Sequence, residues 1–410
     1  MRILLLTQFF WPEMRTAPHN LAAMAADLHS RGHEIQVVTG FPNHPLGKIY
    51  NGYRQRLWQW DEYQGVSILR LPLYPDHSKS LARRIINFTS FVASSSVLGL
   101  ALCRSFKPNV LFVYFAPISI GWTAKWYSVV FHSPIVYWIT DLWIENLIAS
   151  GVKLGARMHR MLRRFENWSY RQASHICVDS PGFKGNLIEK GVPSDKIHVV
   201  TEWAEEDLFF PVEYDEQLAA QHGLSGKFNI VYGGNLGTAQ ALHTIVEAAE
   251  ILVGMPDLQF VFIGDGNETD HLKRMVADRN LANIRFIERQ PMQEIHRFFA
   301  LADVLLVHLK KEPIFMLQLP SKVLAYMACG RPILCAVSGS AEQVVLDAKG
   351  GLSCPSEDPV TMADLARRFY EMARNELEEM GKNARMAYLN NYTRSVQVQR
   401  MEKILKDVVS

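Results

Sequence analysis

The sequence lacks any regular cysteine pattern. It contains five cysteines, an odd number, and no two of them stand in Cys-x-x-Cys spacing. Four of the five lie in or beside strongly apolar segments. This excludes a disulfide framework and is typical of reduced core residues in a cytoplasmic protein. The five are Cys103, Cys177, Cys329, Cys335 and Cys354.

The sequence also lacks an excess of charge of one sign. Lysine and arginine number 43 against 41 aspartate and glutamate, which leaves a net charge of +2. Such a balance does not supply the electrostatic attraction that dominates nucleic-acid binding, so nucleic acid is not an expected partner. With 48% hydrophobic and 20% charged residues, the composition excludes collagen-like, disordered and coiled-coil chains.

Metal-binding and nucleophile motifs are absent as well. The 14 histidines form no His-x-His or His-Glu-x-x-His pattern, and no Asp-x-Asp triplet exists to hold a nucleotide-bound cation. The chain has no Gly-x-Ser-x-Gly elbow, no P-loop and no Gly-x-Gly-x-x-Gly dinucleotide fingerprint. We therefore expect no metal site and chemistry that needs no metal ion.

What is present is an alternation of short apolar runs with longer helical patterns. At roughly 150 residues per domain, 410 residues are too many for one core. The alternation predicts two α/β domains with doubly wound, Rossmann-like parallel sheets facing a cleft. The first run, Arg2–Leu6, is read as a strand and not as a signal peptide because no small-residue cleavage site follows it. The other expected strands are Ile35–Thr39, Val66–Leu71, Val110–Phe115, Ile135–Ile139, Ile176–Asp179, Phe228–Tyr232, Leu258–Ile263, Ile284–Ile287, Val304–Val307 and Ile333–Ala336.

A break in the pattern gives the expected domain boundary. Acidic and then polar residues from about Glu202 to Lys227 include Pro211, Gly223 and Gly226, which are typical of a linker. We therefore expect a first domain over 1–203, a linker over 204–227 and a second domain over 228–385. The helix-forming tail over 386–410 has no strand after it and is expected to cross back to the first domain.

One stretch complicates the interpretation as a soluble protein. Ile85 through Cys103 carries no charge, has the length of a membrane span, and is flanked by Arg83, Arg84 and Arg104. Polar residues inside it and apolar residues at helical spacing favour a helix packed on a sheet. A helix that faces an acceptor or touches a membrane, and a true span, are the alternatives.

Three segments in the second half are candidates for phosphate binding. Gly234-Asn235-Leu236-Gly237 follows an expected strand, and Gly264-Asp265-Gly266 follows the next one. Glycines let backbone amides approach a ligand closely, although each segment is equally readable as an ordinary turn. In the third, Ser321 is expected to cap a short helix that stops at Gly330, which places backbone amides and the Lys322 ammonium at one helix end. A solvated lysine on a capped helix is the alternative.

The first half holds one candidate catalytic pair. Asp141 and Glu145 follow the strand Ile135–Ile139 among aromatic residues, and they share a face if the chain turns helical after Thr140. Apolar neighbours raise carboxyl pKa values and suit such groups to proton transfer. A helix cap at Asp141 with an exposed Glu145 is the alternative.

Taken together, these segments resemble a bacterial retaining glycosyltransferase of family 4, in the branch that builds O-antigen, capsule or other envelope polysaccharides. The resemblance covers nearly the whole chain and implies the GT-B fold. It rests on the order and spacing of Phe10-Trp11-Pro12-Glu13, Arg31-Gly32-His33-Glu34-Ile35, Pro42-Asn43, Asp141-Leu142-Trp143, Gly191-Val192-Pro193, Trp203-Ala204, Gly234-Asn235-Leu236-Gly237 with Ala239-Gln240, Gly264-Asp265-Gly266, Ala302-Asp303-Val304 and Pro320-Ser321-Lys322 with Tyr326-Met327-Ala328.

The chain departs from the broad family at several positions. Asn235 and Gln240 stand where the family has an Arg and a Lys on the donor diphosphate, and Lys322 is the candidate for the missing charge. Thr140 stands in place of the catalytic-region His. The family's Glu-x7-Glu pair fails, because its members align near Leu317 and with Ala325. Paired glycines of the first loop are replaced around Arg15-Thr16-Ala17.

The resemblance implies the following site residues and ligands. Catalytic residues are Asp141, Glu145 and Lys322. Donor-binding residues are Thr16, Gly234, Asn235, Gly237, Gln240, Gly264, Gly266, Arg289, Pro320 and Ser321. Acceptor-binding residues are Glu13, Arg15, Asn43 and His44. The donor substrate is a UDP-sugar, no further cofactor is expected, and the acceptor is a glycan on a polyprenyl diphosphate.

The function expected from these residues is transfer of a sugar, an N-acetylated hexosamine or deoxyhexosamine, with retention of configuration. The protein is expected to be cytoplasmic and peripheral on the cytoplasmic face of the inner membrane. A nucleotide-sugar epimerase of the same fold is one alternative. A noncatalytic partner subunit is the other, because Asn235, Gln240 and Ala325 replace functional groups.

Overall fold

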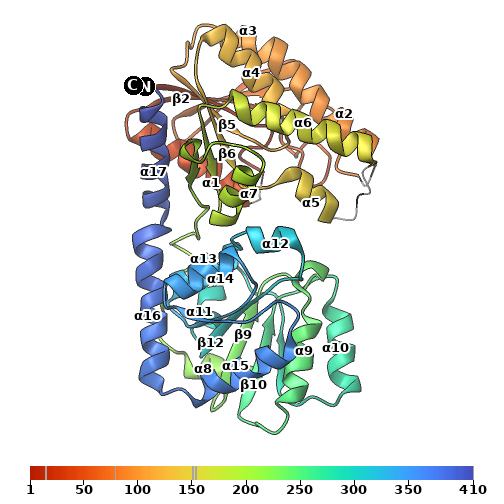
Figure 1. Ribbon diagram of the computed structural model, residues 1–410, viewed down its shortest axis with the longest axis vertical. Helices are drawn as coiled ribbons and strands as arrows, with labels where there is room; N and C mark the ends of the chain where they lie inside the picture. The colour runs from red at the N-terminus through yellow and green to blue at the C-terminus, as the bar shows by residue number, and fades with distance from the viewer. Residues whose placement is uncertain (14–15, 79, 150–151, 153–154, 410) are drawn as a thin grey trace. The chain divides into compact units, whose positions relative to one another are not determined.

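The computed structural model describes residues 1–13, 16–78, 80–149, 152 and 155–409. The chain divides into two compact units (Figure 1). The first comprises Met1–Glu202 and Gln397–Ser410, and the second comprises Trp203–Val396. Each unit is an α/β fold around its own sheet.

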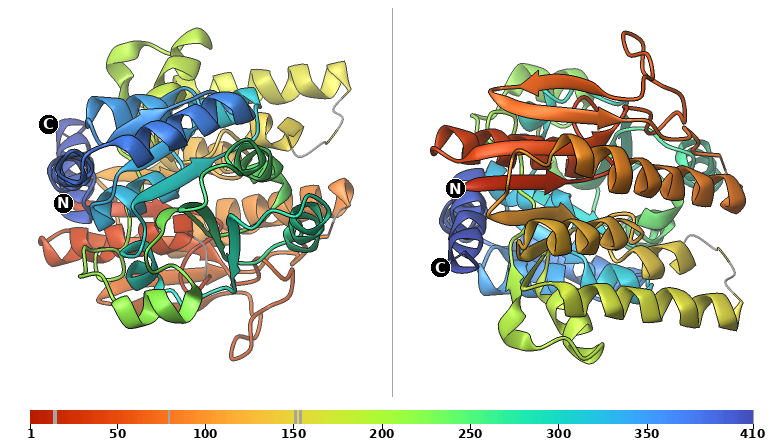
Figure 2. Two further views of the ribbon diagram at one scale, coloured as in Figure 1. Left: turned by 90° about the horizontal axis from the view of Figure 1, so that it is seen from below. Right: turned by 90° about the horizontal axis from the view of Figure 1, so that it is seen from above.

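The first unit is built on an eight-stranded sheet in the order β3-β4-β2-β1-β5-β6-β7-β8, whose red and orange strands lie side by side in the right-hand view of Figure 2. Its strands are β1 (Arg2–Leu6), β2 (Glu34–Gly40), β3 (Gln59–Tyr63), β4 (Val66–Leu71), β5 (Val110–Tyr114), β6 (Ile135–Ile139), β7 (His175–Val178) and β8 (Ile197–Val199). All neighbours pair in parallel except β3 and β4. The parallel strands are buried on both faces, which is why they read as continuous apolar runs.

Helices connect these parallel strands. They are α1 (Thr16–Ser30), α2 (Leu81–Ser94), the π-helical η1 (Ser95–Gly99), α3 (Leu100–Leu102), α4 (Ile120–Phe131), α5 (Trp143–Ala149), α6 (Ala156–Gln172), α7 (Pro181–Glu189) and the short η2 (Ser194–Lys196). Local sequence fixes several starts. For example, the Ser180 side chain accepts a hydrogen bond from the Phe183 N–H at 3.0 Å, and Pro181 occupies the first turn.

The second unit holds a six-stranded parallel sheet in the order β11-β10-β9-β12-β13-β14. Its strands are β9 (Phe228–Gly233), β10 (Leu258–Ile263), β11 (Ile284–Ile287), β12 (Val304–His308), β13 (Ile333–Ala336) and β14 (Gly351–Ser353). Its helices are α8 (Glu216–His222), η3 (Thr238–Gln240), α9 (His243–Ile251), α10 (Thr269–Asp278), α11 (Ile295–Phe299), α12 (Pro313–Leu317), α13 (Ser321–Cys329), α14 (Ser340–Asp347), α15 (Pro359–Glu371) and α16 (Arg374–Asn391). Every strand expected from the sequence is present, and β3, β8 and β14 were not expected.

The segment 204–227, expected to be a linker, differs from that expectation. It belongs to the second unit and contains α8, whose N-terminus is capped by Asp215 through the Leu218 N–H at 3.0 Å. Ala219 and Leu224 are fully buried in the core of that unit. The acidic and polar composition of this segment suggested a linker, although the segment contains the packed helix α8.

The end of the chain returns to the first unit through α17 (Arg394–Asp407). The Gln397 side chain accepts a hydrogen bond from the Thr201 N–H at 3.1 Å. Glu402 forms ion pairs with His33 and Arg31 at 3.0 and 3.1 Å. Because Met401 is also fully buried, α17 is an integral part of the first unit.

The uncharged stretch Ile85–Cys103 forms one continuous helical run through α2, η1 and α3 as far as Leu102, with Cys103 directly after its end. In the described part of the chain, Ala82–Leu102 is the one helix long and apolar enough to cross a membrane by length and composition, and 28% of its most apolar window is buried. One face is packed: Asn87 and Ser95 are fully buried, and Ser95 approaches the Thr123 hydroxyl of α4 at 3.2 Å. On the other face Val97 is 68% exposed. The helix is thus packed on the first unit along one side and leaves an apolar side uncovered.

Candidate functional site

Two glycine turns follow β9 and β10 and pack directly on each other. The Gly234 N–H donates to the Ile263 carbonyl at 2.8 Å. The φ angles of Gly234 and Gly264 are 133° and 145°, which side chains of L-residues rarely permit. A Cβ on Gly264 would lie 1.9 Å from the Gly234 oxygen, and one on Gly266 would lie 2.3 Å from the Leu236 oxygen. The backbones of the two turns are therefore in direct contact, and side chains at Gly264 and Gly266 would clash with the backbone of the other turn.

The lysine of the third segment lies beside the first glycine turn. A Cβ on Gly234 would meet the Lys322 Cε at 2.5 Å and its Nζ at 2.9 Å. The Lys322 ammonium also lies 4.1 Å from the centre of the Tyr232 ring and contacts the Tyr232 hydroxyl. Burial lowers the pKa of Lys322 to about 7. This lysine is accordingly not a solvated surface group.

The helix α13 that carries Lys322 begins differently from the sequence expectation. Pro320 occupies the N-cap position, and Ser321 is the exposed first residue of the helix. No side-chain capping hydrogen bond forms, so the prediction that Ser321 caps this helix is wrong. Since the N–H groups of a first turn have no partners within the helix, they point out of its end. The predicted stop at Gly330 is confirmed, with φ of 68°.

The turn residues Asn235 and Gln240 contact each other across Gly237. The Asn235 amide donates to the Gln240 Oε1 at 3.3 Å, and a Cβ on Gly237 would lie 2.4 Å from Asn235 Nδ2. Buried His308 supports this turn, because its Nδ1 lies 2.6 Å from the Gln240 carbonyl while its Nε2 accepts the Glu357 N–H at 3.1 Å. Burial lowers the pKa of His308 to about 4, so this neutral ring donates from Nδ1.

His308 was not expected from the sequence, although it ends an apolar strand at the carboxyl edge where sites gather. Arg289 was expected at the donor site. It is exposed in the loop after β11, which β10 separates from β9 in the sheet. In the described structure Arg289 makes no hydrogen bond or ion pair with the glycine turns.

The carboxylate pair of the first unit takes two different environments. The helix α5 begins only at Trp143, so Asp141 precedes it while Glu145 lies on it. Glu145 forms ion pairs with Arg163 at 2.7 Å and with Lys190 at 2.8 Å. Burial alone would raise the pKa of Glu145, but the two cations together lower it. The expected upward shift is therefore wrong for Glu145, whose contacts are those of a structural ion-pair group.

Asp141 instead lies near two acids that the sequence analysis did not single out. Asp179 directly follows β7, and its Oδ1 accepts the Glu202 N–H at 2.5 Å. Burial raises the pKa of both Asp179 and Glu202, and the charges of Asp179 and Asp141 raise that of Glu202 further. Three carboxyl groups thus gather beyond the carboxyl ends of the neighbouring strands β6, β7 and β8. Asp179 could have been singled out from the sequence, because it is a carboxylate that directly follows an apolar strand.

The expected acceptor residues follow β1 and β2 in the first unit. Glu13 is buried, and its Oε1 accepts the N–H groups of Asn43 and His44 at 2.8 and 2.9 Å. Burial raises the pKa of Glu13 to about 7 despite these hydrogen bonds. Of the other expected residues in this region, Arg15 and the side chain of Thr16 lie outside the described residues.

The comparison with known families bears on both units. Residues 19–203 match the glycosyl transferase 4-like domain, and residues 215–387 match the glycosyl transferases group 1. The chain carries two glycosyltransferase domains. The glycosyltransferase part of the expected family is confirmed by these matches, which together span most of the sequence.

Curated relatives are glycosyltransferases too. The chain is 29% identical over 308 residues to the probable glycosyltransferase WbjE of Pseudomonas aeruginosa, covering 74% of each chain. It is 25% identical over 337 residues to the putative colanic acid biosynthesis glycosyl transferase WcaI of Escherichia coli, covering 80% of this chain and 82% of that one.

A solved structure confirms the expected GT-B fold of this glycosyltransferase. HepE of Anabaena, crystallised in complex with UDP, superposes with a TM-score of 0.74 at 16% identity, over 99% of this chain and 100% of HepE. The similarity of these structures establishes the fold. The roles of individual residues in donor binding, acceptor binding and catalysis stay predictions.

A metal site is not apparent in the described part of this glycosyltransferase. No group of three or more His, Cys, Asp or Glu side chains there is arranged to hold a metal ion. The three acids Asp141, Asp179 and Glu202 do not form such a group.

Proposed function

We propose that this glycosyltransferase transfers a sugar from a UDP-sugar to a lipid-linked glycan during the synthesis of a cell-surface polysaccharide. The observation that carries the proposal is the position of Lys322 beside the paired glycine turns Gly234 and Gly264. The relation to WcaI, named for colanic acid biosynthesis, supports the polysaccharide pathway. The UDP complex of the structurally similar HepE supports the nucleotide.

The proposed reaction follows from what the second unit presents. The diphosphate of the donor lies against the glycine turns and the first turn of α13, where backbone N–H groups and Lys322 stabilise its negative charge. An acceptor hydroxyl forms the new bond to the anomeric carbon on the face from which the diphosphate leaves, so the configuration is retained. The hydroxyl proton passes to a phosphate oxygen of the departing nucleotide, and the protein supplies mainly charge stabilisation. The transferred group is an N-acetylated hexosamine or a deoxyhexosamine.

The donor is tested by thermal unfolding with a panel of UDP, UDP-sugars, ATP and NAD, each with and without EDTA. At a hundredfold excess over Kd, binding stabilises the native state by about 2.7 kcal/mol, or about 5 to 10 °C in a unit of this size. We expect UDP and a UDP-sugar to raise Tm with EDTA present, whereas NAD does not. Stabilisation by NAD alone, or loss of the UDP effect in EDTA, contradicts the proposal. Binding without any turnover on lipid-linked acceptors selects a noncatalytic subunit instead.

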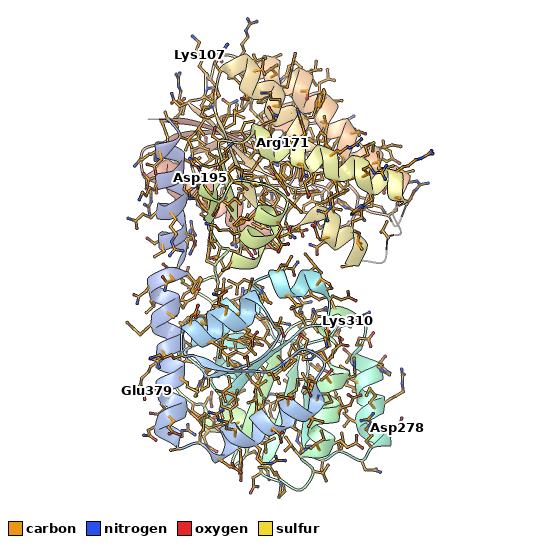
Figure 3. All side chains as sticks on the ribbon, viewed as in Figure 1. Lys107, Arg171, Asp195, Asp278, Lys310 and Glu379 are labelled. Atoms are coloured by element: carbon orange, nitrogen blue, oxygen red, sulfur yellow. The ribbon has the colours of Figure 1, made fainter. Side chains whose placement is uncertain are left out.

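The proposed membrane contact rests on an apolar, basic surface of the first unit. Ile86 and Val97 on the α2–α3 run and Trp122 and Trp126 on α4 are about half exposed or more. No acidic residue occurs between Asp76 and Asp141. Figure 3 labels two further basic residues of this unit, Lys107 after α3 and Arg171 on α6. An apolar face surrounded by cations suits an anionic bilayer and a polyprenyl diphosphate.

Sedimentation with vesicles tests this contact. We expect the wild-type protein to bind anionic vesicles more strongly than neutral ones and to detach as salt rises, because each basic residue near the surface contributes about 1 kcal/mol. Arg83 and Arg84 lie on α2, and the exposed Arg160 and Arg164 lie on α6. Changing these four residues to Gln should remove most of the binding. The matched control changes Arg274, Lys311, Arg368 and Lys382 of the second unit to Gln. Equal binding by both variants would show that Arg83, Arg84, Arg160 and Arg164 are ordinary surface residues with no role in membrane binding.

A further inference from the structure

Two histidines on the last two strands of the first sheet meet through their ring nitrogens. His175 begins β7 and His198 lies in the middle of β8. His198 is opposite Cys177 in the parallel register, and residues two apart on a strand share a face, so both histidines lie on one face of the sheet. His198 Nε2 is 3.0 Å from His175 Nδ1. Neither residue has a part in the proposed reaction or in the proposed membrane contact.

The two rings do not meet along a straight line. A straight N–H···N hydrogen bond of this length would separate the ring centres by about 5.3 Å, because each nitrogen is about 1.15 Å from the centre of its ring. The ring centres of His175 and His198 are instead 4.7 Å apart, with 70° between the ring planes. Shared equally between the rings, this difference tilts each lone-pair axis by roughly 40° from the line that joins the nitrogens. Such a tilt weakens a hydrogen bond and suits two nitrogens that bind a common third atom.

Two imidazole nitrogens on one metal ion have a similar separation. At bond lengths of about 2.0 Å, ligands at right angles lie about 2.8 Å apart and tetrahedral ligands about 3.3 Å apart. The 3.0 Å between His198 Nε2 and His175 Nδ1 falls between these two values. An ion therefore needs only a small movement of the rings. The proton between the two nitrogens moves to the far nitrogen of its own ring, so both imidazoles bind in the neutral form.

The charges around the pair also suit a cation. Burial, His175 and Lys184 lower the pKa of His198, so its ring is neutral at pH 7. Neutral imidazole is the form that binds a metal ion. Asp407 at the end of α17 and Asp195 in η2, which Figure 3 labels, are close enough for their negative charges to act on His198. These two carboxylates attract a cation and offset the charge of Lys184.

We propose that His175 and His198 form a binding site for a divalent transition-metal ion of the Ni²⁺, Cu²⁺ and Zn²⁺ class. In the part of the chain that the structure describes, no group of three or more His, Cys, Asp or Glu side chains is arranged to hold a metal, so the site has two protein ligands and water completes it. Both histidines are half-buried and therefore accessible to an ion. With nitrogen and oxygen ligands, Cu²⁺ should bind more tightly than Ni²⁺ or Zn²⁺.

The position of the site separates it from the proposed reaction. His175 is at the amino end of β7, whereas Asp179 follows the carboxyl end of the same strand. The ion joins β7 to β8 on the face that α17 covers, since Cys177 on this face contacts Met401. The site therefore stabilises the first unit and has no direct contact with a donor bound in the second. UDP binding should be equal with and without the ion.

The test titrates the untagged whole chain with Cu²⁺, Ni²⁺, Zn²⁺ and Mg²⁺ by calorimetry after EDTA treatment and desalting, because a polyhistidine tag would bind the same ions. We expect the first three ions to bind, Mg²⁺ not to bind, and one equivalent of Cu²⁺ to give an electron paramagnetic resonance spectrum with coupling to imidazole nitrogens. His198→Ala should weaken the tightest site at least tenfold. The control is His271→Ala, which removes an exposed histidine from α10. Equal affinity of the wild type and His198→Ala overturns the proposal.

A second variant and a measurement on the wild type keep the test decisive if His198→Ala does not fold. His175→Ala should lose the same site, and Ni²⁺ should raise the Tm of the wild type by several degrees but not that of a folded variant in which either histidine is replaced. Ni²⁺ should also protect His175 and His198 of the wild type from modification by diethyl pyrocarbonate, as mapped by mass spectrometry, while His271 stays reactive. Equal modification of His175 and His198 with and without Ni²⁺ would show that the two rings form only a hydrogen-bonded pair.

Discussion

Replacing Lys322 with alanine is expected to weaken binding of a UDP-sugar by about 10- to 150-fold. A hydrogen bond between a charged donor and a phosphate oxygen contributes about 1.5 to 3 kcal/mol, and 1.4 kcal/mol corresponds to a factor of ten. Asn235 and Gln240, which stand where the wider family has an Arg and a Lys on the donor diphosphate, are neutral. Isothermal titration of both proteins with a UDP-sugar checks the prediction. Lys382→Ala, which removes an exposed lysine from α16 in the same unit, is the control.

The pH dependence of the same titration separates a charge effect from a packing effect. Burial lowers the pKa of Lys322 to about 7, and a bound diphosphate favours its charged form. Affinity should therefore change little below pH 7 and fall as pH rises above it, by at most tenfold per pH unit, with uptake of a proton on binding. The Lys322→Ala variant should lose this slope. If the affinity of the Lys322→Ala variant still falls as pH rises above 7, another group is responsible for the pH dependence.

Replacing Gly264 with alanine is expected to destabilise the second unit by about 2 to 6 kcal/mol. The methyl group would lie 1.9 Å from the Gly234 oxygen, and a φ of 145° is strained for alanine. Strained backbone costs about 1 to 3 kcal/mol and overpacking a similar amount, against a usual stability of 5 to 15 kcal/mol. Urea unfolding followed by circular dichroism measures the change.

The control for this substitution is Gly254→Ala in the same unit. A Cβ at Gly254 has nothing within 4 Å, so its effect on the unfolding free energy should stay within about 1 kcal/mol. Any Gly264→Ala protein that folds should have lost UDP binding, because the turn must move to admit the methyl group. Near-native stability together with native UDP affinity would show that the two turns are not built around contact between their backbones.

The regular parts of the fold were predictable because burial imposes a simple sequence pattern. Parallel strands buried on both faces, such as β5 and β10, stand out as unbroken apolar runs. The antiparallel β3 did not, because Gln59–Tyr63 carries two acids and alternates between half-buried and exposed positions, with no buried residue. The strands β8 and β14 have only three residues each, which is too short to show a period.

The site was predictable only where its contacts are local in sequence. The glycine turns follow their strands directly, so their position could be read from the sequence. The pKa of Glu145 could not, because its partners Arg163 and Lys190 come from distant segments. The contact between Asp179 and Glu202 likewise joins residues 23 positions apart. Both the pKa of Glu145 and the contact between Asp179 and Glu202 depend on tertiary packing, which no local sequence motif reveals.

The return of α17 to the first unit has a consequence for the order of folding during synthesis. The second unit is one continuous stretch, Trp203–Val396, and is complete in the chain before the first unit has received Gln397–Ser410. Until then the surfaces that later cover Met401 and pair with Glu402, including Cys177 and His33, are open. Domains usually fold in the order in which the ribosome makes them. In this glycosyltransferase the half that is made first is therefore the half that is finished last.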